Sequence, residues 1–212
     1  AVDGQSVDSG PELSAAFGET DAETLSVELD DGGTVMLERS AFITSLAGDS
    51  PFAGENGIAT NDTITAVDDT AVSTERGIKQ AAGNETNVTL TYSDGSSGEE
   101  RTVTGPLGVL TTVSEGGPLD AEGAPTGDRI VITSIDGQRV IDFDDVNAAL
   151  EDRSPGETVP VVVYADGEDT EYSVELGSHP DDEDQAFVGI LGSTPLSGLG
   201  VDSVGVMPYP AE

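Results

Sequence analysis

The sequence contains no cysteine, no tryptophan, a single histidine and only 7 Lys plus Arg residues against 42 Asp plus Glu. Without cysteine, neither a disulfide nor a thiolate metal site can form. Without a basic stripe, the chain repels nucleic-acid phosphates and anionic lipid headgroups, so we expect neither class of partner. No segment approaches the ~20 apolar residues of a membrane-spanning helix.

The acidic residues give a formal net charge of −35 over 212 residues. At low ionic strength such a charge destabilises a compact chain, whereas molar salt shortens the Debye length to about 3 Å and screens the repulsion. A disordered acidic chain is the alternative, but the apolar residues are patterned rather than scattered. The composition therefore predicts a folded protein adapted to high salt, from a source like the halophilic archaea.

The sequence offers no recognisable catalytic motif. His179 lies in Gly-Ser-His-Pro-Asp-Asp-Glu-Asp, a segment that we expect to be a flexible acidic linker, unable to hold an imidazole in a Ser-His-Asp triad. Neither His-Glu-x-x-His nor Gly-x-Ser-x-Gly nor a P-loop occurs. The acids at 181–184 do not have EF-hand spacing. We expect no catalytic residue, no metal ligand and no cofactor in this chain.

Internal repetition organises the chain. In order, the best-defined copy contains Gly116-Gly117-Pro118, Gly127-Asp128-Arg129-Ile130, Ile135-Asp136-Gly137, a helical segment over 142–150, and strand-like runs over 158–164 and 170–176 joined at Asp166-Gly167. An Asp-Gly pair between apolar runs favours a tight hairpin, because both central positions of the turn take positive φ.

Two further copies precede this one. The looser of them contains Asp49-Ser50-Pro51, Asn61-Asp62-Thr63-Ile64, Val67-Asp68-Asp69 and Tyr92-Ser93-Asp94-Gly95 in corresponding places. The segment 1–39 reads as the second half of a third copy, since Val2-Asp3-Gly4-Gln5 matches Ile135-Asp136-Gly137-Gln138. We expect this third copy to be truncated. The alternative is that residues 187–206 supply its missing half in a permuted unit.

Each copy combines one amphipathic helix with several short strands, which predicts an α+β fold. We expect the main helices near 74–82 and 142–151. The predicted organisation is a partial repeat at 1–39, complete units at 40–105 and 106–178, and an acidic linker with a return strand at 179–212. Each complete unit should form a small, partly open β-barrel or sandwich with one main helix.

The turn motifs, the helix capped at Asp142 and the closing strand pair together resemble a PDZ domain, of the permuted kind found in microbial membrane proteases. PDZ domains bind an extended peptide at a sheet edge beside a helix. Carried over by position, the resemblance implies that the second copy binds peptide through Pro106, Leu107, Gly108, Val109, Leu110, Val146 and Leu150. For Val146 and Leu150 a role in the core is an equal alternative. The first copy lacks the loop glycine, and its weaker candidates are Arg39, Ala41, Phe42, Ile78 and Ala82.

The segment Phe187-Val188-Gly189-Ile190, which follows the second copy, resembles the arrangement in the site-2 family of intramembrane zinc metalloproteases. That resemblance implies an extracytoplasmic module of a cell-membrane protein, which recognises protein or peptide segments of membrane substrates in regulated intramembrane proteolysis. The zinc ligands would lie in a part of the parent outside this chain. The alternatives are a stand-alone surface scaffold of repeats and the PDZ tail of an HtrA-type serine protease.

Overall fold

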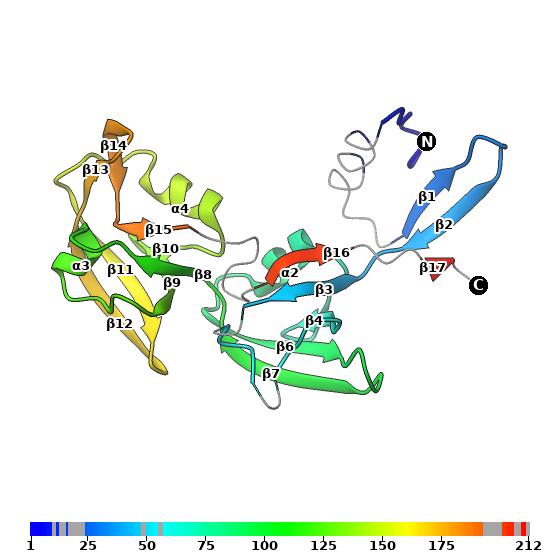
Figure 1. Ribbon diagram of the computed structural model, residues 1–212, viewed down its shortest axis with the longest axis horizontal. Coiled ribbons are helices and arrows are strands. Elements are labelled where there is room, and N and C mark those ends of the chain that lie inside the picture. The colour runs from blue at the N-terminus through cyan, green and yellow to red at the C-terminus, as the bar shows by residue number, and fades with distance from the viewer. Residues whose placement is uncertain are drawn as a thin grey trace.

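The computed structural model describes residues 1–9, 12, 16, 24–47, 50–54, 57–192, 201–205 and 209–210. Most of the described structure is β-sheet, accompanied by a few short helices (Figure 1). Two curled sheets, each accompanied by a helix, confirm the predicted PDZ-like α+β fold.

The first unit is built on a sheet with the strand order β16-β3-β4-β6-β7, in which β5 also pairs with β4. Every neighbouring pair is antiparallel. Its elements are β3 (Ala41–Leu46), β4 (Thr63–Val67), β5 (Thr70–Ala71), α2 (Glu75–Ala82), β6 (Asn87–Ser93), β7 (Glu100–Pro106) and β16 (Val201–Gly205).

The second unit repeats this plan with the strand order β12-β11-β9-β8-β15, and β10 pairs with β9. Its elements are β8 (Val109–Val113), α3 (Pro118–Ala121), β9 (Arg129–Ile135), β10 (Gln138–Arg139), α4 (Phe143–Leu150), β11 (Thr158–Ala165), β12 (Glu168–Glu175), β13 (Gly177–His179), β14 (Asp182–Phe187) and β15 (Ile190–Leu191). Strands β13 and β14 form a separate hairpin, so the residues that we expected to be a linker after 179 are instead structured through Leu191.

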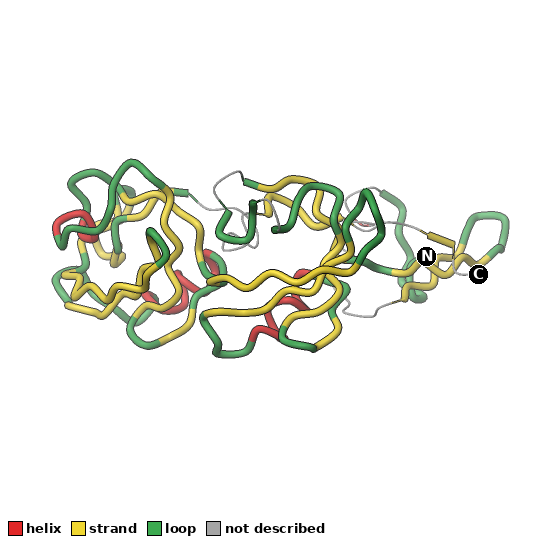
Figure 2. Tube along the Cα trace, turned by 90° about the horizontal axis from the view of Figure 1, so that it is seen from below, coloured by secondary structure: helices red, strands yellow, loops and turns green. Residues whose placement is uncertain are grey.

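A third, smaller sheet has the order β1-β2-β17, formed by β1 (Thr24–Glu28), β2 (Thr34–Glu38) and β17 (Tyr209–Pro210). The two ends of the chain therefore lie at the same end of the molecule (Figure 2). The C-terminal segment contributes one strand to each sheet in reverse order: β15 to the second unit, β16 to the first and β17 to the N-terminal hairpin. The described strands within 187–206, which the permuted alternative assigned to the N-terminal copy, thus pair with the second and first units, and the N-terminal hairpin pairs instead with Tyr209–Pro210.

Both main helices were predicted from sequence, and the structure confirms them within about one residue at each end. The Thr74 hydroxyl accepts a hydrogen bond from the Gly77 N–H at 2.9 Å, which caps α2. Asp142 and Asp145 form a capping box at the start of α4, each carboxylate accepting from the backbone N–H of the other. None of the described helices is long and apolar enough to cross a membrane.

The same hairpin turn recurs in all three copies. Asp3, Asp68 and Asp136 occupy its first central position with φ of 45°, 45° and 51°. The Asp3 N–H donates to the Ser26 carbonyl and the Asp68 N–H donates to the Thr89 carbonyl. In return, the N–H groups of Ser26 and Thr89 donate to the two Asp carboxylates at 2.8 Å. The repeat is therefore a structural one, maintained down to individual hydrogen bonds.

The second unit modifies this turn at one point. The Asp136 N–H donates to the Pro160 carbonyl at 2.7 Å, as in the other copies, but Pro160 has no N–H to return a bond. The Asp136 carboxylate instead forms an ion pair with Arg153.

Two hydrophobic cores lie inside the two units. The second contains residues from β8, β9, α4, β11 and the hairpin. The first contains Phe52, Tyr92 and Leu107, and also Ile141 from the β10–α4 connection of the second unit. Because Ile141 lies in the core of its neighbour, the two units share a packed boundary.

Polar contacts reinforce this boundary. Arg139 Nη1 donates to the Ala82 and Gly83 carbonyls at 2.7 Å each. Lys79 of α2 forms an ion pair with Asp142, the N-cap of α4. The end of one helix and the start of the other are thus joined by side chains.

Candidate functional site

A cleft of about 310 Å³ lies between α4 and the C-terminal strands of the second unit. It is lined by Phe143, Val146, Asn147, Leu150, His179, Pro180, Asp181, Gln185, Ala186, Phe187, Val188, Ile190, Leu191 and Gly192. A cleft with mainly apolar walls and a few polar groups is the usual form of a binding site.

Helix α4 supplies one wall of the cleft. Val146 and Leu150 are 3% and 8% exposed, and their side chains belong both to the core and to the cleft lining. Phe143 and Asn147 complete the wall; Asn147 is exposed. These four positions repeat at i, i+3, i+4 and i+7, which places them on one face of a helix. The two roles that the sequence left as alternatives for Val146 and Leu150 are thus compatible.

Residues 187–190 form the floor at one end of the cleft. The Ser114 N–H donates to the Gly189 carbonyl at 2.8 Å, and the Leu119 N–H donates to the Val188 carbonyl at 3.2 Å. Gly189 has φ +90°, and a Cβ there would lie 2.9 Å from Pro118 Cδ. The loop is therefore packed so closely against α3 that only glycine fits at 189.

Strand β15 supplies the other wall. It pairs antiparallel with β8, Ile190 opposite Val113 and Leu191 opposite Thr112. Beyond it, the Thr111 hydroxyl contacts the carbonyls of Leu191 and Gly192. Among the described strands, β15 is the last in its sheet, and no strand pairs with its outer side. Leu191 is 56% exposed. A terminal strand of this kind leaves backbone groups available to another chain.

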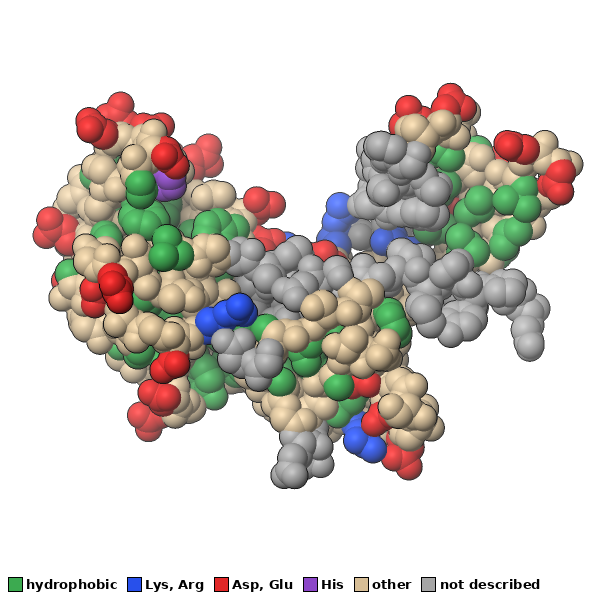
Figure 3. Space-filling view, in the orientation of Figure 1, with side chains coloured by type: hydrophobic (Ala, Val, Ile, Leu, Met, Phe, Trp, Pro, Cys, Tyr) green, Lys and Arg blue, Asp and Glu red, His purple; other side chains and the backbone are tan. Residues whose placement is uncertain are grey.

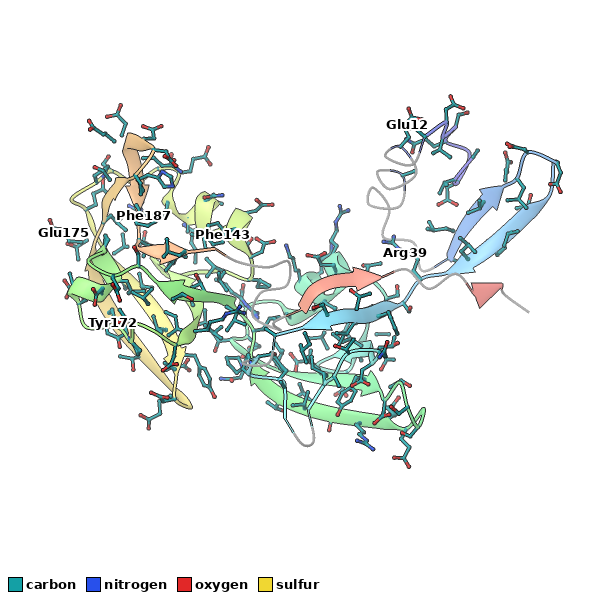
Figure 4. The ribbon with its side chains drawn as sticks, viewed as in Figure 1. Glu12, Arg39, Phe143, Tyr172, Glu175 and Phe187 are labelled. Atoms are coloured by element: carbon teal, nitrogen blue, oxygen red, sulfur yellow. The ribbon has the colours of Figure 1, made fainter. Side chains whose placement is uncertain are left out.

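The β13–β14 hairpin stands at the same end of the cleft as the loop. The His179 ring contacts the Phe187 ring edge to face, with centroids 5.6 Å apart and planes at 85°. His179 Nδ1 accepts a hydrogen bond from the Asp181 N–H at 3.2 Å. The expected flexible linker around His179 is therefore wrong: the residue lies at the end of β13, on the wall of the cleft. Figure 4 shows Phe143 and Phe187 on one side of this unit, opposite the β12 side that carries Tyr172 and Glu175.

The predicted edge at 106–110 is wrong because these residues lie inside the structure. Leu107 is fully buried in the first core, and Pro106 ends β7. Val109 and Leu110 begin β8, where they pair with Ile132 and Val131 of β9 and are 0% and 4% exposed. Strand β15 pairs farther along β8, at Thr112 and Val113. A Cβ at Gly108 would lie 2.3 Å from the Ile132 carbonyl oxygen, so this glycine permits close packing of two strands rather than access for a ligand.

The weaker candidates of the first copy do not form an open edge either. Ala41, Ile78 and Ala82 are buried in the first core. Phe42 lies on β3, where it pairs with Thr63 of β4 on one side and with β16 on the other. Arg39 precedes β3, far from the cleft of the second unit (Figure 4).

The cleft residues that the prediction missed are mainly those of 179–192. The signal was present in the sequence, since Phe187-Val188-Gly189-Ile190 places a glycine between apolar residues directly after an acidic segment. The prediction treated it as a strand leading out of the module. Among the described residues, no group of three or more His, Asp or Glu side chains lies together in a way that could hold a metal ion.

Comparison with known families identifies the second unit. Residues 88–176 match the PDZ domain family, so a PDZ domain is present in this chain. The match begins in β6 of the first unit and ends with β12. It therefore stops before the hairpin and β15, which form much of the cleft.

One curated relative is the "Probable periplasmic serine endoprotease DegP-like" of Bartonella henselae. It is 37% identical to this chain over 76 residues. The matching stretch covers 36% of this chain but 15% of that protein, so the likeness is confined to a segment about the size of one unit.

Proposed function

We propose that the second unit binds an extended segment of another protein in the cleft beside α4, and thereby selects substrates for a protease. The observation that carries the proposal is the pairing of a terminal strand, β15, with the apolar face of α4 across one cleft. The PDZ match supports peptide recognition as the general class of function.

The physical basis is strand addition. A segment lying along β15 would gain main-chain hydrogen bonds from the outer side of that strand, while alternate side chains enter the space between strand and helix. Val146, Leu150 and Ile190 would receive apolar side chains. Binding should be weak, because a short flexible segment loses much of its interaction energy on becoming ordered.

For the parent protein, we favour an intramembrane zinc metalloprotease of the site-2 type, with this chain as its extracytoplasmic regulatory module. This reading rests on the resemblance of residues 187–190, which follow the rest of the unit in sequence and lead into β15, to the site-2 arrangement. In that parent, zinc would be held outside these residues, and the substrates would be membrane proteins.

The second candidate is the PDZ region of an HtrA-type serine protease, which the likeness to the DegP-like protein favours. The sequence of the complete gene distinguishes the two. Hydrophobic helices with a His-Glu-x-x-His motif would support the intramembrane protease, whereas an upstream trypsin-like domain would support the HtrA type.

The binding proposal is tested with two variants on the same helix. Asn147→Trp places a large side chain in the cleft, whereas Ala148→Trp places it at the next position, also exposed but outside the lining. Peptides selected from a random library on the 212-residue chain should bind the first variant about tenfold more weakly, or about 1.4 kcal/mol. They should bind the second variant as they bind the unmodified chain.

Salt is controlled in the same experiment. Binding is measured in about 0.15 M and about 1 M KCl, where the Debye length is roughly 8 and 3 Å. Failure to select any peptide in either salt would contradict the proposal, as would equal binding by the two tryptophan variants.

A further inference from the structure

The cleft contains very little positive charge. Of the fourteen residues that line it, none is Lys or Arg, Asp181 is the one carboxylate and His179 the one imidazole. No Lys or Arg occurs in the sequence after Arg153, so the whole segment that forms the hairpin, the loop and β15 lacks a fixed cation.

The basic residues of the second unit are placed elsewhere. Arg139 donates to backbone carbonyls of the first unit, and Arg153 pairs with Asp136. Arg129 lies on β9, which is separated from β15 by β8. It is level with Leu191 at the end of β15, because both residues pair with Thr112. The loop that contains Gly189 instead precedes the start of β15. None of these three residues lines the cleft.

Acidic side chains instead stand near the loop. Residues 181–184 are all Asp or Glu and all exposed, and Figure 3 shows acidic side chains gathered on the outer end of this lobe, above hydrophobic surface. The hairpin joins the loop directly: the His179 ring contacts Phe187, and the Asp181 N–H is hydrogen-bonded to His179.

The lack of Lys and Arg and the presence of acidic side chains affect whether a chain end or an internal segment of a polypeptide can bind in the cleft. A loop with a positive-φ glycine is where backbone N–H groups can receive a chain-end carboxylate. Here such a carboxylate would enter a cleft that already holds the Asp181 carboxylate and that no Lys or Arg lines, so no fixed cation would offset the cost of its desolvation. An internal segment brings a neutral peptide group to the same place. A Lys or Arg on that segment would interact favourably with the hairpin acids.

We propose that the cleft takes internal segments of proteins rather than chain ends, and prefers segments that carry a Lys or Arg beside an apolar residue. This inference rests on the proposed peptide binding and specifies its ligand class. Asp181, the carboxylate in the lining, is the residue assigned to this preference.

The test uses one selected peptide in three forms: with a free C-terminal carboxylate, with a C-terminal amide, and extended by a Gly-Ser tail. In about 0.15 M KCl the amide and the extended form should bind roughly threefold more tightly than the free acid, as expected for a partly exposed charge interaction. In about 1 M KCl the difference should shrink, because the charges are screened.

Two isosteric variants of the chain, Asp181→Asn and Asp184→Asn, test whether Asp181 causes the preference for a Lys or Arg in the peptide. Lys→Gln in the peptide should weaken binding to the unmodified chain by about threefold. Asp181→Asn should remove that dependence on the peptide lysine. Asp184→Asn, which changes an exposed acid on the same hairpin but outside the lining, should retain most of it.

The outcomes separate this inference from the proposed function. If the free-acid peptide binds most tightly, or if Asp181→Asn leaves the lysine dependence unchanged, the inference is wrong while peptide binding stands. If the unmodified chain binds no form of the peptide, or if Asn147→Trp binds the peptide as tightly as the unmodified chain does, both are wrong.

Discussion

The two units share one fold but differ in what lies against the main helix. Asn147 of α4 is the fifth residue after its N-cap, and Lys79 is the fifth after the N-cap of α2. Asn147 is exposed in the cleft, whereas Lys79 forms an ion pair with Asp142 of the second unit. The corresponding helix position thus lines a cleft in one unit and pairs with the neighbouring unit in the other.

Arg139 of the second unit lies partly buried at the boundary between the units. Burial is the main cause that lowers the pKa of its guanidinium from the ordinary value, although Asp68, Glu85 and Asp145 oppose the shift. The two carbonyls that accept its hydrogen bonds, those of Ala82 and Gly83, are end groups of α2 that have no partner within the helix. The repeat therefore keeps its fold while its helix lines a cleft in one unit and contacts the neighbouring unit in the other.

The largest expected difference between the units concerns two glycines. A Cβ at Gly108 would lie 2.3 Å from the Ile132 backbone oxygen, whereas at Gly105 the nearest atom is in the Phe52 ring, at 3.1 Å. Gly108→Ala should lower the free energy of unfolding by about 3 kcal/mol, since strand backbones must separate, and Gly105→Ala by about 1 kcal/mol or less. Urea unfolding of both variants measures the difference.

The opposite order of these two effects would contradict the packing of β8 against β9. A Gly108→Ala variant with unchanged stability but altered peptide binding would restore the original assignment of this residue to the ligand site.

The second largest loss of stability is expected for substitutions at the boundary between the units. Arg139→Met removes two charged hydrogen bonds to the end of α2 and should lower the free energy of unfolding by about 2 kcal/mol. Hydrogen exchange at the last turn of α2 should become faster. Arg153→Met, which breaks an ion pair within the second unit, is the control and should cost about 1 kcal/mol or less.

Asp142→Asn separates two roles of one side chain. Asparagine still caps a helix well, so α4 should keep its stability while the ion pair with Lys79 is lost, at a cost of about 0.5 kcal/mol. If exchange protection fell in α4 rather than at the boundary with α2, capping would be the dominant role.

The smallest expected difference is in the response to salt. Residues 106–192 contain twenty acids and three bases, whereas residues 40–105 contain ten acids and three bases. Screening should therefore stabilise the second unit more. We expect the melting temperature to rise by about 3 °C for each kcal/mol gained in molar KCl, with the larger gain in hydrogen-exchange protection in the second unit. An unchanged or lower melting temperature would contradict the predicted adaptation to high salt.

Much of the repeat could be predicted because its signals are local. The turns at Asp136 and Asp166 take the positive φ that their Asp-Gly pairs favour. Helix α4 begins at the capping box written in Asp142 and Asp145. These features depend on residues a few positions apart, so a single sequence contains them.

The identity of the outermost strand beside α4 could not be found in this way. Val109 and Leu110 have the apolar character of a strand, but nothing local shows whether that strand has one neighbour or two. Its second neighbour is β15, and the Thr111 hydroxyl contacts residues 80 and 81 positions away in the chain. The C-terminal segment thus pairs with the far end of β8, at Thr112 and Val113, and becomes the outermost strand of the sheet.

The sequence by itself therefore determined the repeated unit, its helices, its tight turns and the acidic surface, because backbone preference and side-chain periodicity act over a few residues. Only the tertiary structure decided which strand is outermost, which helix face is open, and that Lys79 and Arg139 join the two units. Those outcomes depend on which distant segments bury one another's apolar surface and satisfy one another's backbone groups, and this is settled when the whole chain packs.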